Sequence, residues 1–171
     1  MDFTIDVIET MPSNAALAQG GCLFQAAAVL TATAIANANF ALVNKLGNGL
    51  PIWLLSARVQ ATAAMEVDLF RVNADPALTA NTQVQNCQLG GKNAGATFEA
   101  QVVATPGNNG QFGAVEANAD EPSELLPAGV LYIPSGYGVM IASALVAGNV
   151  ALTLVWAEID AAFSDYLAER E

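Results

Sequence analysis

The chain has 171 residues, of which 54% are hydrophobic and 12% are charged, and its 16 acidic and 5 basic residues give a net charge of −11. This length suits one domain with a substantial hydrophobic core, so residues 1–171 are treated as a single domain. The negative charge argues against binding to nucleic acids, whose phosphate backbones would repel the chain.

The scarcity of charged side chains has a consequence for association. Charged residues are depleted at the centres of protein interfaces, whereas a monomer needs charge to cover its surface and stay soluble. We therefore expect the chain to bind further copies of itself, with an alanine-rich monomer as the alternative.

The sequence predicts neither a secretory signal nor a membrane span. Its first residues, MDFTIDVIE, carry acids where a secretory signal has basic residues. Two charge-free runs, Met11–Asn44 and Leu125–Ala157, contain amide side chains or Pro and Gly, which a membrane span disfavours. Cys22 and Cys87 could pair, but two cysteines make no disulfide framework, so we expect reduced, buried thiols.

The N-terminal part begins with an alternating segment, Phe3–Glu9, typical of an edge strand or a partner-facing strand. Residues 1–20 are interpreted as an N-terminal arm. A loop or short helical turn is expected at Asn14–Gln19, and a strand at about Cys22–Thr33 because β-branched residues become frequent there.

Two further strands are expected in the middle of the chain. Phe40–Leu46 ends at Gly47-Asn48-Gly49, which indicates a hairpin turn. In the next strand, Leu50–Thr62, the alternation places Ile52 and Leu54 on the face opposite Ala57 and Val59.

The strand Met65–Val72 alternates more strictly, with Met65, Val67 and Leu69 expected inside and Glu66, Asp68 and Phe70 outside. Further strands are predicted at Val84–Leu89 and Thr97–Thr105, and a turn at Pro106–Gly110.

The C-terminal third contains the clearest pattern. Tyr137–Val146 and Val150–Trp156 are apolar runs joined by Ala147-Gly148-Asn149, which predicts a long hairpin within Val130–Glu158. Alternation in the second run predicts that Trp156 is buried with Val150, Leu152 and Leu154. The tail Asp160–Glu171 predicts a short amphipathic helix.

Eight to ten short strands separated by Gly, Asn and Pro turns predict an all-β fold. The expected architecture is an antiparallel jelly-roll β-sandwich with a short C-terminal helix at residues 160–171.

The sequence contains no histidine, which removes the commonest general base, most nucleophile–histidine pairs and the usual zinc ligands. Gly107–Gly113 (GNNGQFG) lacks the strand-to-helix context and the Lys-Ser/Thr pair of a phosphate loop, so it is interpreted as a turn. We therefore expect no enzyme activity, no cofactor and no metal.

Two groups of acidic residues have alternative interpretations. Glu66 and Asp68 share a strand face and could form a catalytic pair, or they could face solvent and pair with Arg58 across strands. Three carboxylates within Glu116–Glu124 could help to bind Ca²⁺, or they could form a solvated loop. These three are Asp120, Glu121 and Glu124.

Four aromatic residues could form a stacking platform for sugars. Trp53 and Trp156 lie inside apolar strands, where burial in a core or interface is the better interpretation. Tyr132 and Tyr137 flank the turn Pro134-Ser135-Gly136 and are better placed for exposed contacts with a sugar or a neighbouring subunit.

The run LLPAGVLYIPSGYGVMIAS, followed by a Gly-Asn step and LTLVWAEI, resembles the C-terminal strands of small jelly-roll proteins of tailed-phage virions. The step Pro134-Ser135-Gly136 leads into a strand, and Trp156-Ala157-Glu158 ends the last one, as in such chains. The earlier run PIWLLSARVQATAAMEVDLFRV also resembles their central strand pair.

The resemblance implies a virion structural protein at the capsid surface, a capsid decoration or cement protein. It implies a homotrimer that binds the major capsid protein between capsomers. The alternative is a receptor- or carbohydrate-binding module of a phage tail tip or fibre. The candidate contact residues are Phe3, Ile5, Val7, Tyr132, Tyr137, Phe163, Tyr166 and Leu167.

Overall fold

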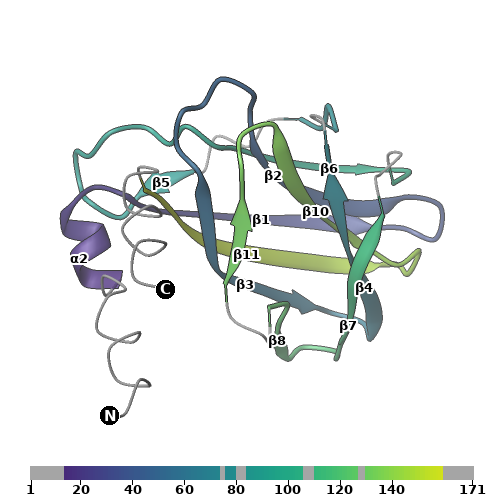
Figure 1. Ribbon diagram of the computed structural model, residues 1–171. Helices are drawn as coiled ribbons and strands as arrows, with labels where there is room; N and C mark the ends of the chain where they lie inside the picture. Colours follow the sequence, from purple (N-terminus) through teal and green to yellow (C-terminus); the bar gives the residue numbers. More distant parts are fainter. Residues whose placement is uncertain (1–13, 74–75, 80–83, 106–109, 127–129, 160–171) are drawn as a thin grey trace, which may run out of the picture.

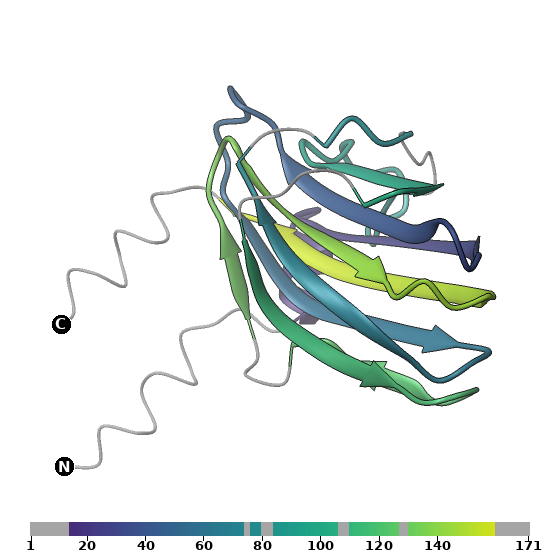
Figure 2. The ribbon, with the colours of Figure 1, turned by 90° about the vertical axis from the view of Figure 1, so that its right-hand side faces the viewer.

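A computed structural model describes residues 14–73, 76–79, 84–105, 110–126 and 130–159. Two antiparallel sheets pack face to face, as Figures 1 and 2 show. The predicted antiparallel β-sandwich is therefore confirmed. The predicted strand Phe3–Glu9 and the predicted helix at residues 160–171 lie outside the described residues.

The first sheet has the strand order β5-β1-β11-β3-β8, with β9 also paired to β3, and the second has the order β6-β2-β10-β4-β7. Strands of the first sheet are β1 (Leu23–Ala32), β3 (Ile52–Ala61), β5 (Gln85–Asn86), β8 (Pro122–Glu124), β9 (Leu131–Ile133) and β11 (Gly148–Glu158). Strands of the second are β2 (Asn37–Asn44), β4 (Met65–Val72), β6 (Thr97–Val103), β7 (Gln111–Ala117) and β10 (Tyr137–Ser143). A short helix, α2 (Asn14–Gln19), precedes β1.

Strand β11 lies at the centre of the first sheet, paired along its length with β1 and β3. Its alternate side chains Val150, Leu152, Leu154 and Trp156 are buried between the sheets, as the alternation predicts. The Trp156 ring stacks on Phe24 of β1 with ring centroids 6.0 Å apart. Such a pair adds to the stabilisation that burial of the two rings provides.

The buried carboxylate of Glu158 ties the end of β11 to the second sheet. It accepts hydrogen bonds from the backbone N–H groups of Gly95 (2.8 Å) and Ala96 (2.9 Å), which lie just before β6. The Trp156 indole N–H donates to the same carboxylate at 3.2 Å. A buried carboxylate costs little when several donors satisfy it, so this junction is stable.

The two predicted hairpins are wrong. β10 and β11 belong to opposite sheets, and so do β2 and β3. Gly148 is already the first residue of β11 and pairs with Ala32. A Gly-Asn step permits the chain to reverse, but it does not decide whether the next strand joins the same sheet or crosses to the other. In this fold the chain crosses to the other sheet at both turns, and each of the four strands has a neighbouring strand on both sides.

The predicted alternation of β3 is also wrong after Leu54. Trp156 is paired with Leu54 and Val155 with Ser56, so Leu55 is an extra residue in the ladder. Such a β-bulge shifts the alternation by one residue. Ile52 and Leu54 before the bulge and Ala57 and Val59 after it therefore all point into the core.

The other predicted elements agree with the structure in varying degree. β4 has the predicted inward and outward residues, and the strand predicted at Val84–Leu89 is reduced to the two residues of β5. The described residues form eleven strands rather than eight to ten, because three of them are only two or three residues long.

Where the structure describes the two charge-free runs, they are mostly strands, and no helix in the described part is long and apolar enough to cross a membrane.

We predict that Trp156→Ala lowers the free energy of unfolding by about 3–5 kcal/mol, because it empties the largest buried site in the core. Urea unfolding followed by circular dichroism measures the change. Val29→Ala on the neighbouring strand is the matched control, since Val29 is 66% exposed and should change stability by less than about 0.5 kcal/mol. Equal losses in both variants would contradict the assignment.

Candidate interaction site

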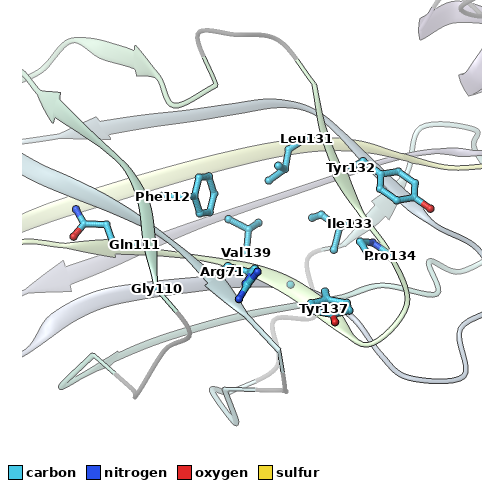
Figure 3. Close-up of a pocket in the computed structure, with 11 residues that line it drawn as sticks. Arg71, Gly110, Gln111, Phe112, Leu131, Tyr132, Ile133, Pro134, Tyr137 and Val139 are labelled. Carbon is cyan, nitrogen blue, oxygen red and sulfur yellow. The ribbon is translucent and has the colours of Figure 1, made fainter.

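A cleft with a volume of about 620 Å³ opens at one edge of the sandwich, where β4, β7 and β10 face β9. We call it the aromatic cleft. Its floor consists of Leu131, Ile133 and Val139, and its rim carries Arg71, Phe112 and Tyr137, whereas the ring of Tyr132 points away from the hollow. In Figure 3 the side chains of Phe112, Leu131, Val139 and Ile133 gather around the hollow, with Arg71 and Tyr137 along one side. The volume is in the range of ordinary ligand sites.

A β-bulge places Phe112 on the rim. Leu69 is paired with Gly113 and Phe70 with Gln111, which leaves Phe112 as the extra residue in β7. The backbone N–H of Arg71 donates to the carbonyl of Gly110 at 3.0 Å and continues the pairing beyond the bulge. A bulge redirects the side chain of its extra residue. Phe112 is therefore 51% exposed although its neighbours are apolar.

Tyr132 is held by an aromatic neighbour on the adjacent strand. Tyr132 of β9 is paired with Trp53 of β3, and their ring centroids are 4.9 Å apart in an edge-on arrangement. Tyr132 remains 47% exposed and Trp53 is partly buried. The contact holds the ring of Tyr132 beside Trp53 on the outer face of the first sheet, away from the hollow.

A tight turn brings Tyr137 to the opposite side of the rim. Gly136 has a φ of 84°, a conformation that glycine adopts without strain, and its N–H donates to the Asn44 carbonyl at 2.8 Å. Gly138 then passes so close to its neighbours that an added Cβ would lie 2.8 Å from the Leu42 carbonyl oxygen and 2.9 Å from Val72. Glycine is therefore required where β10 enters the second sheet.

Arg71 gives the cleft a positive charge in an acidic protein. Within the described part of the chain Arg71 forms no ion pair and no carboxylate lines the cleft, whereas Arg58 pairs with Glu124 at 3.2 Å. Arg71 is exposed, and its planar guanidinium can bind a carboxylate through two parallel hydrogen bonds. The arrangement suits a ligand with an apolar body and a negative group.

Two of the predicted contact residues border this cleft, but only Tyr137 lies along the hollow. Tyr132 comes from the first sheet and Tyr137, 41% exposed, from the second, so their predicted exposure is confirmed. Arg71 and Phe112 were not predicted as site residues, because Phe112 lies in the segment interpreted only as a turn. The remaining predicted contact residues lie outside the described residues; they are Phe3, Ile5, Val7, Phe163, Tyr166 and Leu167.

The carboxylates of Glu66 and Asp68 share the outer face of β4, as predicted, but Arg58 is not their partner. Arg58 lies on the first sheet, whereas Glu66 faces Glu116 of β7. Asp68 accepts a hydrogen bond from the Gln111 side chain at 2.6 Å. Burial, and then the charge of Glu66, raise the pKa of Asp68 above its ordinary value of 3.8.

The acidic stretch near β8 has a structural role through Glu124. Its carboxylate accepts hydrogen bonds from the Ala57 N–H at 3.0 Å and from Arg58, while Asp120 and Glu121 are exposed. Among the described residues no three His, Cys, Asp or Glu side chains are close enough to hold a metal ion.

The two cysteines are free, and both are partly exposed rather than buried as predicted. Partial burial raises the pKa of the Cys87 thiol, which makes the reactive thiolate less abundant.

We predict that Gly138→Ala lowers the free energy of unfolding by about 1–3 kcal/mol, because the new methyl group overlaps the backbone of β2. Gly113→Ala is the control, since a Cβ there would meet Leu69 at an ordinary 3.7 Å. Thermal unfolding of both variants decides the matter. A Gly138→Ala variant as stable as the control would show that the close approach is absent.

We predict that Asp68→Asn is at least as stable as the parent at pH 7. The raised pKa means that the folded state holds the proton more tightly than the unfolded chain, so stability is lost as pH rises above 3.8. The advantage of the variant should therefore shrink below that pH, which urea unfolding at pH 7 and pH 3 measures. Asp120→Asn, which removes the same charge, tests whether net charge alone is responsible. A less stable Asp68→Asn at pH 7 would contradict this account.

No family model, no curated protein and no solved structure matches the chain.

Proposed function

We propose that the protein is a virion structural protein of a tailed phage, a decoration or cement protein that binds the major capsid protein between capsomers. It acts as a homo-oligomer, most simply a trimer, and by binding rather than by catalysis. The strand order of the two sheets is the observation that carries this proposal.

In a jelly roll of eight strands, one sheet pairs the first strand with the last, the last with the third, and the third with the sixth. The other pairs the second with the seventh, the seventh with the fourth, and the fourth with the fifth. With β5, β6 and β9 set aside, the orders β1-β11-β3-β8 and β2-β10-β4-β7 follow this scheme. The agreement supports the jelly roll that the phage resemblance implies.

The distribution of charge supports a role in assembly. The outer face of β1 and β11 carries only uncharged side chains, among them Gln25, Ala27, Val29, Ala151 and Thr153. Of the eight described acidic residues, four lie on β4, β7 and β8, two lie just before β8, and Glu99 and Glu158 are buried. A face without charged side chains has the composition of an interface core, and acidic residues elsewhere keep the assembled protein soluble.

The direct test is addition of the purified protein to heads assembled from the major capsid protein encoded in the same genome. We expect saturable co-sedimentation and a higher melting temperature of the heads, because a cement protein stabilises the state that it binds. Light scattering of the free protein should give a trimer or another stable oligomer. Absence of co-sedimentation, or a monomer at micromolar concentration, would contradict the proposal.

We further predict that the candidate contact residues of the C-terminal segment contribute to head binding. Replacing Phe163, Tyr166 and Leu167 together by Ser should weaken co-sedimentation and leave unfolding of the sandwich unchanged. Asp165→Asn in the same segment is the control. Full head occupancy by the triple variant would show that this segment does not dock.

A receptor- or carbohydrate-binding module is the second candidate, and the aromatic cleft favours it. Phe112 and Tyr137 are exposed aromatic residues at the cleft on which a sugar can stack, beside the donors of Arg71. A glycan array separates the two functions. Specific sugar binding that Tyr137→Ala abolishes would favour the receptor-binding module, and its absence would favour decoration.

A further inference from the structure

The aromatic cleft lies at the open edge of the sandwich, between two strands that each have one partner. Within the described residues, β7 ends the second sheet and pairs only with β4, and β9 pairs only with β3. Strand edges of this kind accept a further extended segment through main-chain hydrogen bonds. The cleft therefore offers both strand edges and an apolar floor to one extended peptide.

The side chains of the cleft define the peptide that fits. Its floor of Leu131, Ile133 and Val139 requires apolar side chains, and the guanidinium of Arg71 requires a carboxylate. In an extended peptide these groups must occupy alternate positions, about 7 Å apart, to point to the same side.

We propose that the aromatic cleft binds residues 3–9 (FTIDVIE) of a second copy of the chain. These residues lie outside the described part, and their sequence has the required pattern. Three alternate positions, Phe3, Ile5 and Val7, are apolar and match the floor. The next position on that side, Glu9, carries the carboxylate that pairs with Arg71.

Helix α2 and the aromatic cleft lie on opposite sides of the first sheet. Leu17 of α2 packs with Leu23 at the start of β1, on the outer face of the first sheet. The cluster around Leu17 also includes Trp53 of β3, the strand beside β9, and the cleft lies on the other side of that sheet. A second copy can present its segment to the cleft without passing round the sheet edge, and the scarcity of charged side chains favours such self-association.

The proposal does not depend on a virion role, and the purified full-length chain tests it without phage heads. Arg71→Glu and Glu9→Arg should each weaken self-association about tenfold in light scattering at low salt, because each places like charges together. The two changes combined in one chain should restore association to within about threefold of the parent. Arg58→Gln is the control for loss of a guanidinium, since Arg58 pairs with Glu124, and it should leave association unchanged.

Disulfide trapping identifies the copy that supplies the segment. In a chain with Cys22→Ser and Cys87→Ser, one variant carries Val7→Cys and another carries Phe112→Cys. Mixed under mild oxidation, the two should form a cross-linked pair faster than Val7→Cys mixed with Ile35→Cys, whose cysteine lies in the exposed turn between β1 and β2. Thermal unfolding of each variant confirms that it is folded.

Three results would overturn the proposal. The combined charge reversal could fail to restore association, or the Val7–Phe112 cross-link could form no faster than its control. In the third, a chain carrying both Val7→Cys and Phe112→Cys would form an intramolecular disulfide at a rate that dilution does not change. That result would show that each cleft binds the N-terminal segment of its own chain.

Discussion

The fold depends on the burial of β11 between β1 and β3. The apolar face of this strand fills the centre of the core, and its last residues, Trp156 and Glu158, connect the core to the backbone before β6. One strand therefore holds the first sheet together and anchors it to the second. Loss of Trp156 would remove the ring stacked on Phe24 and also the indole N–H that donates to the buried Glu158 carboxylate. Core packing and the hydrogen bonding of Glu158 therefore depend on the same side chain.

The aromatic cleft exists because the sandwich does not close at the edge where β7 and β9 meet. The bulge in β7 turns Phe112 toward the hollow, and the short β9 leaves its far edge without a strand partner in the described residues. Arg71 adds the single cation, so the opening has a preference for acidic, apolar segments in a chain that is otherwise strongly acidic.

The strands were predictable and their partners were not. Alternation identified β4 and β11 and the burial of Trp156, because period-two patterning reports directly on which face is buried. It failed at Leu55, where the bulge leaves no mark in an apolar run. The Gly-rich turn sequences indicated where the chain reverses. Which sheet the next strand joins depends on contacts between residues far apart in the sequence. For the same reason the sequence revealed Tyr132 and Tyr137 as exposed aromatics without joining them to Arg71 or Phe112.

The pairing of β1 with β11 has a consequence for how the chain folds during synthesis. Consecutive strands mostly belong to different sheets, so nearly every ladder joins residues far apart in the sequence. Chains dominated by such pairings fold slowly, because closing a long loop costs conformational entropy before the paired strands can stabilise each other. The first sheet cannot be completed until Glu158 has left the ribosome. A nascent chain therefore exposes the apolar strand β1 throughout translation, and its demand for chaperones is greatest just before the last strand emerges.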